Sequence, residues 1–313
     1  MGRPAAASDT PPDAAQGTRR GAHRSGSWPH WDALNRVTAA SGLATSLAYT
    51  YDRDANRLTR TAGAATTTSA YDRTGVLVSR VDTPTTTYYA YDGYGNLTSN
   101  ASAVNQNTAF TYDLADRLLT IVLPGGGNTT TTFTLDALGR IATRTPPGAT
   151  AETYAYLGTS ETVWQISATS TTSSALDPGG HRVASGSGGT TGFLLPDLHA
   201  NLAAVTNSAE TAILSATRYD PYGLTAATYD SGGAFPTHWK FQGRLDLSAN
   251  PADPLYEFSA RFYLPATGTF SQLDSYAGSV ADPLSLNRYL YAAANPWTLI
   301  DPSGHRPCAT VEC

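Results

Sequence analysis

Three ionisable residues near the C-terminus, Arg261, Asp274 and Asp301, have side chains suited to acid–base chemistry. Arg261 and Asp274 stand thirteen positions apart in "ARFYLPATGTFSQLDS", which is otherwise almost free of charge, and Asp301 opens the motif "DPSG". Two carboxylates that share a site cannot both ionise easily, so one keeps its proton while the other acts as a base on a water or a peptide. An arginine beside them favours the ionised partner and orients it through paired hydrogen bonds.

A structural role for the same residues is the alternative. The stretch from Asp301 to Gly304 also suits a tight turn, with Asp first, Pro second and Gly fourth. Arg261 could serve only to neutralise a buried carboxylate. The chemical role requires a fold that brings Asp274 and Asp301 together.

A repeat dominates the chain upstream of these residues. Five segments align without gaps, and their aspartates, at positions 52, 72, 92, 113 and 136, are separated by 20, 20, 21 and 23 residues. The segments are "YTYDRDANRLTRT", "SAYDRTGVLVSR", "YAYDGYGNLTSN", "FTYDLADRLLTI" and "FTLDALGRIATR". Degenerate copies follow around Leu157, Asp197 and Asp220, which gives about eight units over 49–228.

Each unit predicts a β-hairpin. An alternating Tyr/Thr run favours a strand, and the Asp that ends it can accept hydrogen bonds from the N–H groups of the following turn. A residue that tolerates positive φ completes the turn, and a Leu or Ile begins the return strand. The positive-φ positions are expected at Asn56, Gly75, Gly95, Asp116 and Gly139. One hairpin is marginal alone, so neighbouring hairpins are expected to pair into one long, curved antiparallel sheet.

Composition excludes several classes of function. The chain has 313 residues, 18 of them Tyr, only 14% charged residues and a net charge of −5, with no basic cluster outside its N-terminal stretch. A nucleic-acid groove therefore has no electrostatic support. The longest apolar runs are far shorter than the roughly 20 residues of a membrane-spanning helix, and the first residues lack the apolar core of a classical signal peptide.

The period "Y-D-x-x-G-R-L" resembles the YD repeat of Rhs proteins, which include bacterial polymorphic toxins, the C component of insecticidal toxin complexes and the animal teneurins. The resemblance implies an all-β fold, in which a spiralling antiparallel hairpin sheet forms a partial shell closed at one end by a core domain. In that family the shell encloses the protein's own C-terminal toxin. We expect a shell shorter than a full enclosure, open at its N-terminal end.

The block from Trp239 onward resembles the Rhs-associated core domain. The matching residues are Phe241, Gly243, Tyr256, Ala260, Arg261, Tyr263, Gly268, Phe270, Asp274, Asn287, Tyr289, Tyr291, Asn295, Pro296, Asp301, Pro302 and Gly304. In many members this domain cuts its own chain just after Asp-Pro-x-Gly. The resemblance therefore implies that Arg261, Asp274 and Asp301 form an aspartic-protease-like site that cleaves in cis between Gly304 and His305.

These resemblances, together with the composition of the N-terminal stretch, give the expected domains. They are a disordered tail over 1–40, the YD-repeat shell over 41–238, the core domain over 239–304, and the remnant of a variable tail over 305–313. The sequence departs from the family where His305 replaces an apolar residue at the cut, and where the family's S-P-D-P has become Ser271-Gln272-Leu273-Asp274-Ser275, without either proline. Nine residues after the cut are too few for a folded toxin.

The expected partner is a C-terminal payload, delivered outside the cell or to a cell surface by a secretion apparatus. No cofactor and no metal are expected: Cys308 and Cys313 near His305 could hold zinc or form a disulfide, but incidental cysteines in a short tail fit better. Two alternatives stay open. One is a non-enzymatic surface protein whose tyrosines stack on carbohydrate, and the other is a decayed remnant without activity.

Overall fold

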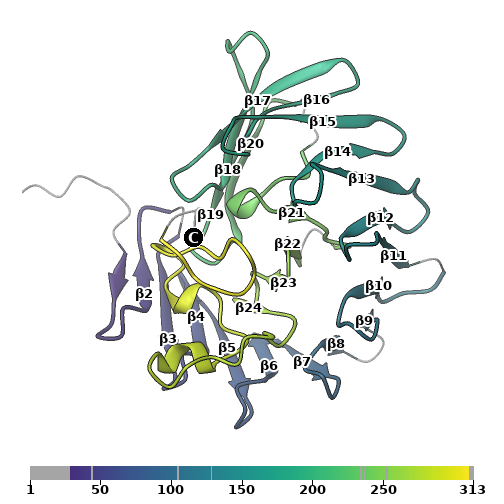
Figure 1. The fold of residues 1–313 in the computed structure, drawn as a ribbon. Coiled ribbons are helices and arrows are strands. Elements are labelled where there is room, and N and C mark those ends of the chain that lie inside the picture. Colours follow the sequence, from purple (N-terminus) through teal and green to yellow (C-terminus); the bar gives the residue numbers. More distant parts are fainter. Residues whose placement is uncertain are drawn as a thin grey trace, which may run out of the picture.

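A computed structural model describes residues 29–43, 45–103, 106–127, 129–232, 235, 237–250 and 253–309. Two sheets make up most of this part of the chain (Figure 1). The prediction of an all-β fold with a curved antiparallel hairpin sheet is confirmed. Within the described residues, no helix is long and apolar enough to cross a membrane.

The large sheet contains 20 strands in chain order. They are β1 (His30–Trp31), β2 (Val37–Ala40), β3 (Leu47–Tyr51), β4 (Arg57–Ala62), β5 (Ala65–Tyr71), β6 (Leu77–Asp82), β7 (Thr85–Tyr91), β8 (Leu97–Ala103), β9 (Gln106–Tyr112), β10 (Leu118–Val122), β11 (Thr130–Leu135), β12 (Ile141–Thr145), β13 (Glu152–Tyr156), β14 (Val163–Ser167), β15 (Thr171–Leu176), β16 (Arg182–Ser187), β17 (Thr190–Pro196), β18 (Leu202–Asn207), β19 (Ile213–Tyr219) and β20 (Thr225–Asp230).

Each strand pairs antiparallel with its neighbours along the chain, and the sheet curls around the C-terminal region (Figure 1). The sheet begins at His30, inside the stretch expected to be tail, so residues 30–40 belong to the shell. Residues 1–28 lie outside the described part.

The YD turns form as predicted, with one correction. In the turn after β7, Asp92 Oδ1 accepts hydrogen bonds from the backbone N–H groups of Tyr94 and Asn96, both at 2.9 Å, and Gly95 has φ +87°. In the first repeat the positive φ falls on Ala55 and not on Asn56. Asn56 lies one position later, where its side-chain amide donates to Asp52 Oδ2.

Two turns of the same kind escaped the sequence analysis. Asp32 accepts hydrogen bonds from the N–H groups of Leu34 and Arg36, and Asp177 accepts one from His181. Neither aspartate lies in a segment that the repeat alignment included, so the sequence analysis did not mark them. These turns explain why the sheet has more strands than eight two-stranded units supply.

A tyrosine hydroxyl joins neighbouring repeats. The hydroxyl of Tyr112 donates to the carbonyl oxygen of Leu97 at 3.0 Å, fifteen residues earlier in the chain. The same bond recurs along the sheet, from Tyr51 to Val37, from Tyr71 to Arg57 and from Tyr156 to Ile141. In these four repeats the tyrosine before the turn therefore satisfies a carbonyl at the start of the previous return strand.

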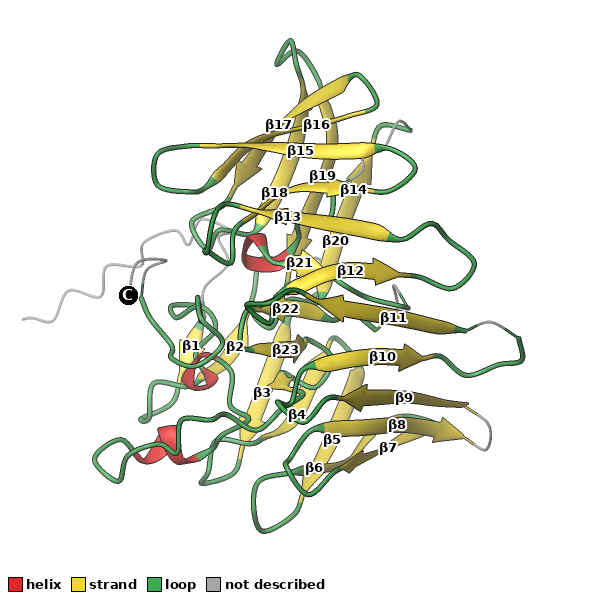
Figure 2. Cartoon of the chain, turned by 45° about the vertical axis from the view of Figure 1, so that its right-hand side comes forward, coloured by secondary structure: helices red, strands yellow, loops and turns green. Residues whose placement is uncertain are grey.

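The small sheet contains β21 (Leu245–Asp246), β22 (Tyr256–Phe258), β23 (Arg261–Leu264) and β24 (Thr269–Phe270). Three short 3₁₀ helices accompany it: η1 (Phe241–Gly243), η2 (Pro283–Leu286) and η3 (Ala292–Ala294). Figure 2 shows β21 to β23 on the inner side of the large sheet.

Apolar side chains of this C-terminal region fill the concave side of the shell. Trp239, Leu247 and Leu255 belong to one buried cluster with shell residues such as Phe133 and Ile166. A second cluster is mainly aromatic: Phe258 lies 5.5 to 5.9 Å, centroid to centroid, from Tyr263, Phe270 and Tyr291. The shell therefore wraps around its own core domain.

Residues 271–291 of the core domain also cover the rim that carries the YD turns. Leu97 N–H donates to the carbonyl of Ser271 at 2.8 Å, and Leu273 N–H donates to the carbonyl of Gly95 at 3.1 Å. The Tyr289 hydroxyl donates to the same Gly95 carbonyl at 2.8 Å. A side chain at position 95 would collide with Leu273 and Tyr289 at 2.7 Å, so glycine there serves both the turn and this contact.

We predict that Tyr112→Phe lowers the free energy of unfolding by about 1 to 2 kcal/mol, because it leaves the Leu97 carbonyl without its donor in a partly buried site. Chemical denaturation followed by circular dichroism measures the change. Tyr94→Phe is the matched control, since the Tyr94 side chain is 73% exposed, and it should change stability by less than about 0.5 kcal/mol. Equal effects in the two variants would contradict the role of the inter-repeat bond.

Candidate functional site

The fold brings the three predicted residues together. Arg261 is the first residue of β23, Asp274 follows β24, and Asp301 lies in the loop after η3. Arg261 Nη2 lies 2.8 Å from Asp274 Oδ2 and 3.8 Å from Asp301 Oδ2. All three residues are buried, with exposed fractions of 3%, 5% and 1%. One guanidinium nitrogen therefore faces both carboxylates.

The same arginine contacts the peptide bond that was expected to be cut. Arg261 Nε donates to the carbonyl oxygen of Gly304 in a short, buried hydrogen bond. Gly304 has φ +74°, and a β-carbon there would collide with the carbonyl oxygen of Phe258. Glycine is therefore required for the Gly304 carbonyl to approach Arg261.

The nitrogen of that peptide bond faces the second carboxylate. The backbone N–H of His305 donates to Asp301 Oδ1 at 3.0 Å. The ring nitrogen Nδ1 of His305 lies 2.7 Å from Asp274 Oδ1. Arg261, Asp274 and Asp301 thus surround the bond between Gly304 and His305, with the arginine at its oxygen and Asp301 at its nitrogen.

Burial and charge shift the ionisation of two of these groups. Burial raises the pKa of Asp301 above its ordinary value, against the opposing effect of the Arg261 charge. Burial lowers the pKa of Arg261 to about 10, opposed by the charges of Asp274 and Asp301. Arg261 therefore stays positive at neutral pH, while Asp301 favours its protonated form more than an exposed aspartate does.

Residues that the sequence did not single out complete the site. Arg288 Nε donates to the backbone carbonyl of Asp274 at 2.7 Å, and the Arg288 carbonyl accepts from Arg261 Nη1 at 2.8 Å. Tyr276 N–H donates to Asp274 Oδ1 at 2.9 Å. Arg244 Nη2 donates to the carbonyl oxygen of Pro302 at 2.6 Å. Arg288 lies between Asn287 and Tyr289, which the core-domain resemblance did mark, but its own position carried no signal.

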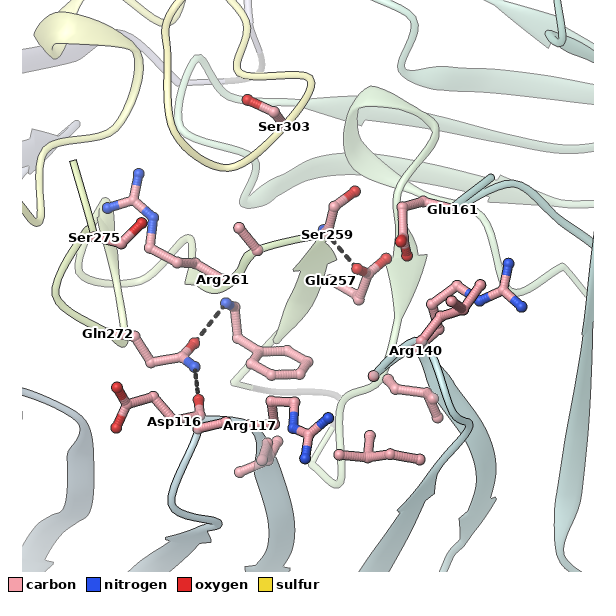
Figure 3. A pocket seen from close by; sticks show the side chains of 18 of the residues that line it. Asp116, Arg117, Arg140, Glu161, Glu257, Ser259, Arg261, Gln272, Ser275 and Ser303 are labelled. Carbon is pink, nitrogen blue, oxygen red and sulfur yellow. Dashed lines mark hydrogen bonds between the residues drawn. The ribbon is translucent and has the colours of Figure 1, made fainter. Parts of the chain in front are cut away.

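A cavity of about 520 Å³ adjoins the site. In Figure 3, Arg261, Ser275 and Ser303 line one side of it, and Glu161 and Arg140 lie on the other. Pockets of about 300 to 1,000 Å³ suit small ligands, so this space can hold solvent or a few side chains but not a folded domain.

No metal centre forms in the part of the chain that the structure describes: nowhere do three or more His, Cys, Asp or Glu residues gather as metal ligands. Cys308 is disulfide-bonded, which corrects the expectation of incidental cysteines. Cys313 lies outside the described residues.

Comparison with known proteins places this fold in a shell family. The teneurin YD-shell family matches residues 30–297, so the chain belongs to the YD-shell family. A crystal structure of TcdB2-TccC3-TEV is similar with a TM-score of 0.50 and 17% identity, covering 89% of this chain and 18% of that one. A crystal structure of TcdB2-TccC3 without its hypervariable C-terminal region gives the same values. These likenesses show the fold.

Two curated bacterial proteins share shorter stretches. The tRNA nuclease WapA of Bacillus subtilis (strain 168) is 33% identical over 88 residues, covering 28% of this chain and 4% of its own length. The tRNA3(Ser)-specific nuclease WapA of Bacillus spizizenii is 31% identical over 107 residues, 34% of this chain and 4% of that protein. The chain therefore spans a small fraction of the length of these relatives.

We predict that replacing Asp301 changes how stability depends on pH. Because the folded-state pKa of Asp301 is raised, the folded protein binds a proton more tightly than the unfolded chain does, and stability falls as the pH rises from the ordinary aspartate value through the raised one. Asp301→Asn should lack this fall, so its stability relative to the wild type should improve with increasing pH. Denaturant unfolding from pH 4 to pH 8 measures the difference, and a constant difference would contradict the raised pKa.

Proposed function

We propose that this protein is the cleavage-bearing part of an Rhs-type toxin shell and that it cuts its own chain between Gly304 and His305. The observation that carries the proposal is the contact of Arg261 Nε with the Gly304 carbonyl oxygen, beside Asp301 Oδ1 at 3.0 Å from the His305 nitrogen. A turn-forming role for Asp301 alone leaves the arginine contact to that carbonyl unexplained.

The proposed step is addition of water to the Gly304 carbonyl carbon. Asp274 takes a proton from the water, using the acceptor position left on Oδ2, since Oδ1 already accepts two bonds. Arg261 holds the negative charge that develops on the Gly304 oxygen. Asp301, whose raised pKa favours its protonated form, donates its proton to the His305 nitrogen as the C–N bond breaks. Substrate and catalyst are one chain, so positioning costs little.

We propose that a payload is enclosed by shell strands other than the 20 described here, because these surround the core domain. The concave side of the described sheet is filled by Trp239, Leu247, Leu255 and their neighbours, and the adjoining cavity has the size of a small-ligand site. The WapA relatives, named as tRNA nucleases, and the TcdB2-TccC3 likeness favour a toxin as the payload. We propose delivery of that payload outside the producing cell or to a cell surface by a secretion apparatus.

The alternative of a carbohydrate-binding surface has less support. The tyrosines before the turns are used inside the fold, where their hydroxyls bond to carbonyls of neighbouring strands. The large exposed tyrosines lie in three separate parts of the chain: Tyr88 and Tyr94 in β7 and the turn after it, Tyr229 in β20, and Tyr276 in the loop after β24.

We predict that the purified full chain loses the segment after Gly304 in denaturing mass spectrometry. Asp274→Asn and Asp301→Asn should each slow the cut at least about a hundredfold, a loss typical of positioned acid–base groups. Asp177→Asn is the matched control: Asp177 also faces a histidine, His181, but in an exposed shell turn, and its replacement should leave the rate unchanged. Persistence of the intact wild-type chain, or cleavage of Asp274→Asn at the wild-type rate, would refute the proposal.

A further inference from the structure

The cavity of about 520 Å³ beside the candidate site also contains two charged side chains that the proposed cleavage does not use. Glu257 belongs to β22 of the core domain, and Glu161 lies in the turn between β13 and β14 of the shell. Both line the cavity, and Figure 3 shows their carboxylates next to each other. The cavity is therefore acidic at a place where the core domain meets the shell.

Neither glutamate forms an ion pair within the described part of the chain. Arg244 and Arg182 are close enough to Glu257 to affect its ionisation. Their guanidinium groups are directed elsewhere: Arg244 donates to the carbonyl oxygen of Pro302 at 2.6 Å, and Arg182 donates to that of Val163 at 2.7 Å. No arginine therefore neutralises Glu257 by direct contact.

The other charged residues that line the cavity already have partners. Arg140 Nη1 donates to the carbonyl oxygens of Gly158 and Ser160, and its guanidinium lies 4.2 Å from the centre of the Tyr156 ring. Asp116 Oδ1 accepts from the side-chain amide of Asn96 at 2.7 Å. Each lining arginine has its own carboxylate, in the pairs Arg140–Asp136, Arg117–Asp113 and Arg261–Asp274. Glu161 and Glu257 are left as negative charges without a partner.

The ionisation of both glutamates reflects this lack of a partner. Burial raises the pKa of Glu257 above its ordinary value, against the charge of Arg244, and the charge of Glu161 adds to the rise. Burial also raises the pKa of Glu161, opposed by the charge of Arg140. A positive group placed beside both carboxylates would stabilise their ionised forms.

The remaining wall of the cavity is largely apolar. It includes Leu118, Leu135, Leu138, Ile141, Phe262 and the ring of Tyr156. Calcium prefers about six to eight oxygen ligands, and no group of three or more metal-binding side chains occurs among the residues that the structure describes. An ammonium or guanidinium group has enough donors for two carboxylates, and its carbon stem packs well on apolar side chains. The lining therefore suits an organic cation better than a metal ion.

We propose that this cavity binds an organic cation, an ammonium or guanidinium group on an apolar stem. Glu161 and Glu257 bind the charged head, and Leu135, Leu138 and Phe262 contact the stem. A free amine and the side chain of a lysine or arginine in a peptide share this chemistry. The inference is independent of the proposed cleavage, because that step uses neither glutamate.

Isothermal titration calorimetry on the purified full chain tests the proposal, with phenylbutylamine as the cation and phenylbutanol as its uncharged counterpart. The amine should bind at least about tenfold more tightly, because the alcohol makes no charge-assisted hydrogen bond to the carboxylates. Equal binding of the two compounds, or no binding of the amine, would overturn the proposal.

Substitution of the two carboxylates tests the assignment of residues. Glu257→Gln should weaken binding of phenylbutylamine at least about tenfold, and Glu161→Gln, whose carboxylate is more exposed to solvent, at least about threefold. Both should leave the affinity for phenylbutanol unchanged, which also reports that the cavity is intact. Glu210→Gln, in the exposed turn between β18 and β19, is the matched control. Wild-type affinity for the amine in both cavity variants would contradict the assignment.

Two further titrations identify the kind of cation. Binding of Nα-acetyl-lysine amide with the same dependence on Glu257 supports the site and indicates a peptide side chain as its ligand. Binding of phenylbutylamine without binding of the lysine amide supports the site and indicates a free amine. Displacement of phenylbutylamine by calcium ions at equal concentration would overturn the proposal, because the two carboxylates would then serve a metal ion.

Discussion

The structure depends on how each hairpin satisfies the backbone of the next. An aspartate oxygen accepts the N–H groups of its own turn, and the tyrosine before it donates to a carbonyl of the preceding repeat. Both bonds fall at turns, where the strand ladder is interrupted and buried polar groups would otherwise lack partners. Tyr112 at the end of β9, for example, bonds to Leu97 at the start of the neighbouring strand β8. These bonds order the turns at the rim of the shell, and the core domain contacts that rim at Gly95 and Leu97.

The rim of the curved sheet helps to position the candidate site. Gly95 and Asn96 contact Leu273 and Gln272, which precede Asp274 in the chain, so the shell fixes one carboxylate from outside the core domain. The aromatic cluster around Phe258 holds Arg261 from within the core domain, because Phe258 in β22 pairs directly with Arg261 in β23. Burying two carboxylates and an arginine is costly unless all remain paired. The site is thus assembled by packing that surrounds it on both sides.

The contacts of His305 in the structure could not be inferred from its departure from the family pattern. In the sequence, His305 is only a polar residue at a position where the family has an apolar one. In the structure its ring lies against Asp274 and its backbone against Asp301, so it contacts both carboxylates of the site. The residue that departs from the pattern therefore contacts two carboxylates of the core domain.

The sequence by itself determined the hairpin repeat and the turn chemistry of Asp92 and its equivalents, because the hydrogen bonds of a turn join residues that are close in the chain. It also supplied the three ionisable residues as candidates, through their types and the motifs around them. It missed the turns at Asp32 and Asp177, which lie outside the aligned repeats, and it placed the positive φ of the first aligned repeat at Asn56 in place of Ala55. Only the tertiary structure decided that Arg261 reaches Gly304, that Arg288 and Arg244 join the site, and that the core domain fills the shell. Those contacts join positions far apart in the chain, and their geometry follows from the curvature summed over all the strands.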